Sequence, residues 1–267
     1  MNPKNITRNG DCILTEVLLN KSDLSIFNKH SLKYKLAAAE KDYLLAVVLK
    51  IVYGSSIGKK LVFKGGTAIH HCYLSQTRFS EDLDFSSLDK LISMKEVKSV
   101  FESQDFLEVK DEYVSEKTIQ IERLKYHGPL GFPNSLKIDI DFAQEIILPP
   151  RVVNFKNPWK IKVRVNAMDV TEICAEKIRA VNERSRYRDF YDLFLLIKNF
   201  KFNMSEIMDL VRRKEARKPM SKRRILKNWD NAVYEREKEL GSIYYALAIP
   251  DLEIIKMIKD MSITKER

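Results

Sequence analysis

The side chains best suited to metal chemistry are those of Asp82 and Asp84, two positions apart in a segment that alternates polar and apolar residues. This alternation is typical of a half-buried β-strand, on which both carboxylates project from the same face. A later segment repeats the alternation and offers a third carboxylate, Asp139 or Asp141. Carboxylates in this arrangement hold Mg²⁺, or Mn²⁺ in its place, together with the phosphates of a substrate.

A glycine pair upstream supplies the second part of such a site. Gly65 and Gly66 directly follow a short segment that begins with the apolar residues 61–63, and the chain contains only eight glycines. Glycines after a strand let backbone N–H groups approach a phosphate, and the positive end of a following helix dipole favours the anion. Thr67 is predicted to cap that short helix, which would run to residue 73.

Each of these features is weak by itself. A Gly-Gly pair is usually only a turn, and an Asp-x-Asp pair on a strand edge is usually solvated. The order strand, Gly-Gly-Thr, helix and Asp-x-Asp is the more specific signal, because it brings a phosphate cradle and two carboxylates close together in the sequence.

The elements that must position these residues follow from the hydrophobic pattern. In the first part of the chain, helices are predicted over residues 32–53 and 93–103, and strands over residues 61–63, 82–85, 107–114, 118–126 and 136–142. In the second part, only helices are predicted, over residues 170–184, 189–198, 204–213, 221–240 and 252–261. The prediction is an α+β protein with an α/β domain at residues 1–165, which includes an N-terminal helix, and a helical domain at residues 166–267.

Composition limits the class of protein. The chain has 267 residues, of which 45% are hydrophobic and 31% are charged, as in ordinary globular proteins. Its three cysteines show no CxxC spacing, which excludes a zinc ribbon and argues against a disulfide framework. No apolar stretch is long enough to span a membrane and no secretory signal is visible, so we expect a cytoplasmic protein without a membrane partner.

The formal net charge of +10 is concentrated in one segment. Residues 212–227 contain nine lysines and arginines against one acid. A patch of this kind suits a polyanion such as RNA, because neutralising phosphates releases counterions. The alternative is a solvated basic helix face. The candidate RNA contacts are Arg212, Arg213, Arg223 and Arg224.

Two residues of the helical half stand out by position. Lys177 lies on an apolar stripe, where a lysine is unusual unless its ammonium meets an anion. The predicted role is nucleotide binding through the triphosphate, and the alternatives are a structural ion pair or extension of the ammonium to solvent. Asp189 precedes the next apolar stripe. It either holds the side chain of Lys177 or Arg184 in place, or it caps the helix that follows. Arg78, before the Asp-x-Asp segment, is expected to contact a phosphate or to pair with Glu81.

Two stretches, FKGGTA at residues 63–68 and RFSEDLDF at residues 78–85, resemble the AbiEii/AbiGii toxin family. This family is a MenT-like branch of the polymerase-beta-type nucleotidyltransferase superfamily, whose pattern is a glycine pair, Asp-x-Asp and a distant third acid. EKDY at residues 40–43, EKIRA at 176–180 and RDFYD at 188–192 agree with it. The resemblance spans roughly residues 36–260.

The resemblance implies a nucleotidyltransferase-type mixed sheet with helices, followed by a helical region. It places the family's metal pair on Asp82 and Asp84, and its later lysine and aspartate on Lys177 and Asp189. Thr67 corresponds to the hydroxyl residue after the glycines. One departure concerns the third carboxylate, because the strand from residue 136 carries two acids where the family usually shows one. Asp139 is favoured there, and Asp141 stays open.

The activity implied is transfer of a nucleotide from an NTP to an acceptor, with RNA, in MenT-like members a tRNA 3′ end, as the expected acceptor. A cognate antitoxin is the expected protein partner. Mg²⁺ held by Asp82 and Asp84 would bridge the triphosphate, and Asp139 would help to deprotonate the acceptor hydroxyl. The alternatives are a kinase-like phosphotransferase that uses the same cradle and a catalytically silent nucleic-acid-binding regulator.

Overall fold

The computed structural model describes residues 5–8, 11–14, 16–88, 92–214, 218–240, 244–261 and 263. The chain divides into two compact units. The sheet unit comprises residues 1–72, 80–143 and 151–167, and the helical unit comprises residues 73–79, 144–150 and 168–267. The short segments 73–79 and 144–150 therefore pack with the helices, although both lie within the first part of the sequence.

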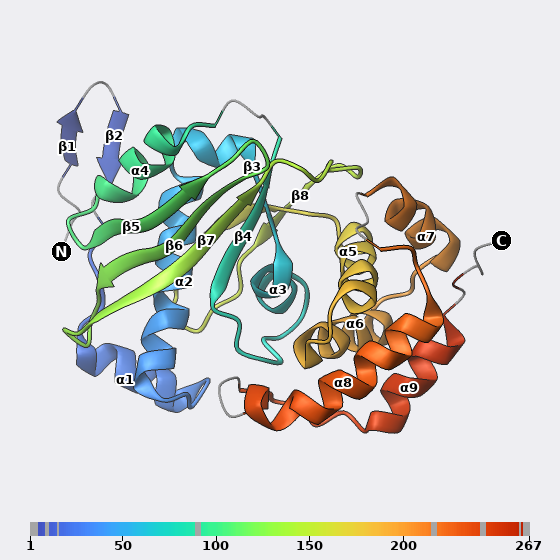
Figure 1. Cartoon of the computed structure of the whole chain (residues 1–267). Coiled ribbons are helices and arrows are strands. Elements are labelled where there is room, and N and C mark those ends of the chain that lie inside the picture. Colours follow the sequence, from blue (N-terminus) through green and yellow to red (C-terminus); the bar gives the residue numbers. More distant parts are fainter. Residues whose placement is uncertain are drawn as a thin grey trace. The chain divides into compact units, whose positions relative to one another are not determined.

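The sheet unit is built on a mixed sheet of seven strands in the order β5-β6-β7-β4-β3-β9-β8 (Figure 1). Antiparallel pairing joins β5 to β6, β6 to β7, β3 to β4, and β8 to β9, whereas β4 runs parallel to β7 and β3 parallel to β9. The strands are β3 (Leu61–Lys64), β4 (Asp82–Ser87), β5 (Leu107–Val114), β6 (Thr118–His127), β7 (Pro133–Asp141), β8 (Arg151–Asn154) and β9 (Arg164–Ala167).

One face of this sheet forms the core of the unit. The helix α2 (Leu36–Tyr53) lies across that face and contacts β7 and β9, while α4 (Met94–Glu102) contacts β5 and α2 (Figure 1). Apolar residues of the strands, such as Leu83, Ile138 and Ile140, are buried there. Because side chains alternate along a strand, the intervening residues of β4 and β7 must share the other face.

Short elements complete the sheet unit. They are the hairpin of β1 (Asn5–Arg8) and β2 (Asp11–Leu14), the helix α1 (Lys21–His30), a 3₁₀ turn at Ser56–Lys60, the helix α3 (Gly65–Ala68) and a π-helical turn at Ile69–Tyr73 that continues α3. In α4 the predicted boundary is confirmed by a capping box, in which Ser93 and Glu96 bond to each other's backbone N–H.

The helical unit contains α5 (Val170–Glu183), α6 (Tyr187–Asn199), α7 (Met204–Arg213), α8 (Lys222–Leu240) and α9 (Asp251–Asp260). Within it, α5 contacts α6, α7 and α8, and α9 contacts α6 and α8. All five helices were predicted from their periodicity with small differences at the ends. No helix among the residues that the structure describes is long and apolar enough to cross a bilayer.

The structure differs from the sequence-based prediction at several elements. β1, β2, α1, β8 and β9 were not predicted, because they are too short or too polar to give a clear period. β7 begins at Pro133, three residues before the predicted start, because its first residues pair with the end of β6. Thr67 is not a helix cap, since α3 already begins at Gly65 and Lys64 is the residue before it.

Candidate active site

The parallel pairing of β4 with β7 brings the candidate carboxylates together. In this register Asp82 lies opposite Lys137 and Asp84 lies opposite Asp139. The four residues are half-buried and share the sheet face that does not form the core. Asp84 and Asp139 are therefore neighbours across two adjacent strands, as a shared cation site requires.

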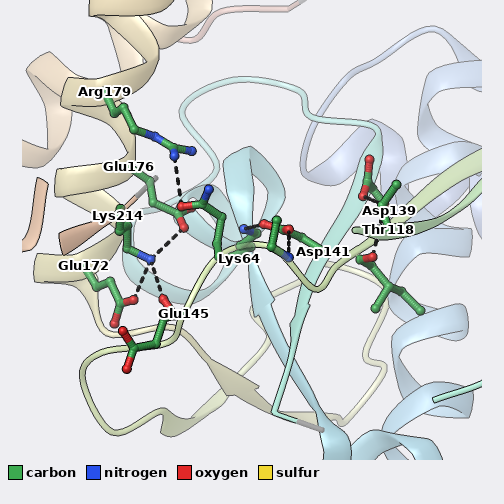
Figure 2. A network of polar contacts seen from close by, with 12 residues as sticks. Lys64, Thr118, Asp139, Asp141, Glu145, Glu172, Glu176, Arg179 and Lys214 are labelled. Atoms are coloured by element: carbon green, nitrogen blue, oxygen red, sulfur yellow. Dashed lines mark hydrogen bonds and ion pairs between the residues drawn. The ribbon is translucent and has the colours of Figure 1, made fainter. Parts of the chain in front are cut away.

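The two candidates for the third carboxylate have different partners. Asp139 accepts a hydrogen bond from the Thr118 hydroxyl at 2.9 Å (Figure 2) and another from the Gln120 amide nitrogen at 2.8 Å. Asp141 instead forms an ion pair with Lys64, whose Nζ lies 2.9 Å from Oδ2 (Figure 2). The partners of Asp139 are neutral, so its negative charge is not offset by them, whereas the charge of Asp141 is offset by a lysine.

Gly65 lies directly against Asp84. Its φ is +76°, in the left-handed region that favours glycine, and a Cβ atom added there would lie 2.1 Å from Asp84 Oδ2. From the sequence, this glycine is predicted to form part of a phosphate cradle. The structure shows a second reason for glycine here, which is that any side chain at position 65 would overlap the carboxylate.

The hydroxyl of Thr67 has a structural partner. It donates a hydrogen bond to the backbone carbonyl of Asp82 at 2.6 Å, and the residue is fully buried. This bond ties α3 to the first residue of β4. The predicted role of Thr67 as a helix cap is wrong, and the residue instead fixes the distance between the glycine turn and the Asp-x-Asp strand.

Lys137 lies on the same sheet face, opposite Asp82. A hydrogen bond to Glu122 is the main reason that its pKa is raised; burial opposes the rise, and the charges of Glu122, Asp82 and Asp139 add to it. The ammonium is 2.8 Å from Glu122 Oε1. Lys137 therefore stays a cation beside the cluster formed by Asp82, Asp84 and Asp139.

A divalent cation is the cofactor that these acids could hold. Among the described residues, no group of three or more His, Cys, Asp and Glu side chains forms a ready-made metal cage. Mg²⁺ rarely uses such a cage, because it keeps several waters and binds one or two carboxylates together with substrate phosphates. The hard oxygen donors of Asp82, Asp84 and Asp139 fit that mode of binding.

Within the helical unit, Lys177 is held in a buried ion network. Its Nζ lies 2.9 Å from Asp189 and 2.8 Å from Asp192, and Arg184 also pairs with Asp189 at 2.7 Å. Burial alone would raise the pKa of Asp189, but Lys177 and Arg184 outweigh it and hold that pKa well below its usual range. Of the alternatives predicted for Lys177, the structure therefore shows ion pairs, which the lysine forms with two carboxylates.

Arg78 belongs to the same network. Its guanidinium donates two hydrogen bonds of 2.7 Å to Asp192 and is buried. The predicted alternatives for Arg78, a phosphate contact or a pair with Glu81, are not what the structure shows, since Glu81 pairs with Lys41 instead. The bidentate geometry of Arg78 and Asp192 is typical of a strong structural ion pair.

The basic segment at residues 212–227 is not uniformly exposed. Lys214 is buried and its Nζ lies 2.6 Å from Glu172 and 3.0 Å from Glu176 (Figure 2). Arg212 pairs with Asp209, and Arg213 lies 3.8 Å from Glu145. Residues 215–217, which include the segment's one acid, lie outside the described residues.

The remaining part of the segment lies at the start of α8. Arg223 and Lys227 are exposed and one helical turn apart, whereas the Arg224 guanidinium donates to the Pro219 carbonyl at 2.6 Å. Of the candidate RNA contacts, Arg223 is thus the most accessible on this helix.

Thr118, Gln120 and Asp192 were not predicted as site residues from the sequence, and Lys64 had no predicted role. The signal for Asp192 was present, because it lies three residues after Asp189 and therefore on the same side of a helix. Thr118 and Gln120 gave no such signal, since their link to Asp139 depends on which strands pair.

With this geometry in place, comparison with known proteins identifies the family. Residues 50–257 match the family described as "Nucleotidyl transferase AbiEii toxin, Type IV TA system". The chain belongs to this family of nucleotidyltransferase toxins.

Among solved structures, the fold is similar to that of MenT4, a nucleotidyltransferase toxin from Mycobacterium tuberculosis. The TM-score is 0.66 at 21% sequence identity, over 90% of each chain. This likeness confirms the predicted α+β fold class, a mixed sheet with helices followed by helices. No curated protein sequence matches the chain.

Proposed function

We propose that this protein transfers a nucleoside monophosphate from an NTP to an acceptor hydroxyl of RNA, with Asp82, Asp84 and Asp139 as the ligands of a divalent cation. Membership of a nucleotidyltransferase family establishes the general reaction class. The observation that carries the proposal is the β4–β7 register, which sets Asp84 beside Asp139 on a polar sheet face with Gly65 against Asp84.

The residues divide the chemical work as follows. A bound Mg²⁺ would offset the negative charge of the triphosphate and polarise the α-phosphate for attack. Asp82 and Asp84 would hold the cation on one strand face. Asp139 would take up the proton of the acceptor hydroxyl while the hydroxyl oxygen bonds to the α-phosphorus. The bond from that phosphorus to the leaving pyrophosphate would break.

The backbone at Gly65 and Gly66 supports a phosphate contact. Because Gly65 has no side chain, its backbone can lie close to Asp84 and to any phosphate that shares a cation with Asp84. Thr67 supports this arrangement indirectly, through its hydrogen bond to the Asp82 carbonyl.

Lys177 and Asp189 are proposed as catalytic residues on the family resemblance. The two residues form an ion pair, so a change to either one alters the surroundings of the other. RNA as the acceptor rests on the family and on the exposed Arg223 and Lys227, and a cognate antitoxin as partner rests on the family's place in toxin–antitoxin systems.

Labelled nucleotides test the proposed reaction. The protein is incubated with total RNA, Mg²⁺ and each of the four NTPs in turn, labelled with ³²P at the α- or the γ-phosphate. Nucleotidyl transfer leaves the α-label in RNA and releases the γ-label as pyrophosphate. RNA that acquires the γ-label would show a kinase-like phosphotransferase, and no label from any NTP would overturn RNA as the acceptor.

A further inference from the structure

Each oxygen of the Asp139 carboxylate accepts a hydrogen bond from a neutral side chain on β6. The Thr118 hydroxyl lies 2.9 Å from Oδ1, and the Gln120 amide nitrogen lies 2.8 Å from Oδ2. Only the nitrogen of the Gln120 amide can donate to a carboxylate, so chemistry fixes which way that amide points. A third acceptor, the Ile140 carbonyl, lies 3.1 Å from the Thr118 hydroxyl, farther than the carboxylate.

The strand register explains why these two residues reach Asp139. β6 runs antiparallel to β7, with Gln120 opposite Asp139 and Thr118 opposite Asp141. Residues 118 and 120 alternate with the buried Ile119 and Ile121, so both donors project from the sheet face that carries Asp84 and Asp139. All of these residues lie in the sheet unit.

Orientation is the property that two such donors control. The terminal torsion of an aspartate has a broad energy profile, so a free carboxylate rotates readily. Donors on both oxygens restrict that rotation and leave each oxygen a further lone pair for a cation. The donors are neutral, so they fix the carboxylate without offsetting its charge.

We propose that Thr118 and Gln120 are positioning residues that hold the Asp139 carboxylate in the orientation in which it binds a divalent cation beside Asp84. This inference rests on the proposed function, because it assigns Asp139 to the same metal site. Hydrogen bonds to metal-binding carboxylates typically change metal affinity by about ten- to a hundred-fold.

The test measures binding of Mn²⁺ alone, followed by the loss of the free-ion signal in electron paramagnetic resonance. Thr118→Val keeps the shape of the side chain and removes the donor, whereas Thr118→Ser keeps the donor. We expect Thr118→Val and Gln120→Ala each to raise the Mn²⁺ dissociation constant by about tenfold or more, and Thr118→Ser to stay within about twofold of wild type.

Activity gives a second measurement with the same variants. Because the donors act through a metal ligand, the Mg²⁺ concentration for half-maximal transfer should rise in Thr118→Val and Gln120→Ala, and high Mg²⁺ should restore most of the rate. A variant that merely folds poorly would lose rate at every Mg²⁺ concentration, and circular dichroism would show the loss.

Two acid variants separate this inference from the proposed function. If Asp84→Asn and Asp139→Asn weaken Mn²⁺ binding while Thr118→Val and Gln120→Ala bind like wild type, the positioning role is wrong and the metal site stands. If neither acid variant changes Mn²⁺ binding, the metal site itself is wrong, and the positioning role falls with it.

Discussion

At Gly65, backbone conformation and a neighbouring side chain both limit what the position can hold. Its φ of +76° costs an L-residue about 1–2 kcal/mol, and an added Cβ atom would overlap the Asp84 carboxylate. The conformation affects only stability, whereas the overlap displaces a proposed metal ligand. The two effects can be separated, because Gly131 has the same φ but no neighbouring atom that an added Cβ would overlap.

We predict that Gly65→Ala lowers the free energy of unfolding and abolishes nucleotidyl transfer. Gly131 is the matched control, since its φ is also +76° but no atom lies within 4 Å of an added Cβ. Gly131→Ala should lose about 1–2 kcal/mol, the cost of the left-handed conformation alone, and keep its activity. Urea denaturation and α-label incorporation measure the two effects. Equal behaviour of the two variants would show that contact with Asp84 does not matter.

The paired acids of β4 lead to a prediction of lost activity without lost stability. Asp82→Ala and Asp84→Ala should each abolish transfer, because both proposed metal ligands lie on one strand face. Removing one of several clustered acids relieves repulsion in the metal-free protein, so the Tm should hold or rise slightly. Near wild-type incorporation of α-label by Asp84→Ala would contradict the site assignment.

At the scale of elements, α5 and α6 are joined by charges buried between them. Lys177 on α5 bridges Asp189 and Asp192 on α6, and Asp192 also binds Arg78. Without Lys177, Asp189 would keep Arg184 and Asp192 would keep Arg78, so the loss is that of charged hydrogen bonds, about 1.5–3 kcal/mol, and not that of an acid left without a cation. The network therefore stabilises the packing of α5 against α6, and it also contains the proposed catalytic residues Lys177 and Asp189.

Lys177→Met should both destabilise the protein by about 1.5–3 kcal/mol and reduce transfer from the NTP. Methionine keeps the volume of the stem, so the loss reports the missing charge. Lys198→Met on α6 is the control, because that lysine is largely exposed and its pair with Glu253 is at 4.0 Å, so its effect should stay below about 1 kcal/mol. Chemical denaturation with both variants tests this. If Lys177→Met is as stable as Lys198→Met, the network does not stabilise the packing of α5 against α6.

The network also predicts a dependence on pH. The pKa of Asp189 is lower in the folded protein than in the unfolded chain, because Lys177 and Arg184 outweigh the effect of burial. Its contribution to stability is thus present above the unfolded pKa, about 4, and lost as the pH falls further. Asp189→Asn should be less stable than wild type at pH ~6, and the difference should shrink by pH ~3. A difference that is independent of pH would contradict the role of this ionisation.

At the scale of the whole molecule, the net charge of +10 favours binding of a polyanion, and the structure shows which of the clustered basic residues can take part. Lys214 cannot, because it is buried against Glu172 and Glu176. Arg223 and Lys227 can, because both are exposed on α8 and lie one turn apart.

We expect the double charge reversal Arg223→Glu and Lys227→Glu to weaken RNA binding. The slope of log K against log[salt], which is negative, should become smaller in magnitude by about 1–2. The control is Lys59→Glu with Lys95→Glu, which makes the same change in net charge at exposed positions of the sheet unit. Binding measured from ~50 to ~300 mM salt compares the two. Equal slopes would assign the effect to net charge and not to a local RNA surface on α8.

The sequence by itself determined the chemical elements of the site and most of the secondary structure. Asp82 and Asp84 were placed on one strand face by alternation alone, and the turn at Gly65 was recognised from its position between a strand and a helix. Helices α5 to α9 followed from their periodicity. These features are local, and local periodicity reports which face of an element is buried.

Only the tertiary structure decided which residues meet. The β4–β7 and β6–β7 registers set Asp139 beside Asp84 and bring Thr118 and Gln120 to it, and a shift of one residue in pairing would turn every side chain to the other face. The burial of Lys214 and the pairing of Arg78 with Asp192 likewise join residues distant in sequence. Such contacts depend on packing between elements, so the charge pattern of a single segment could not predict them.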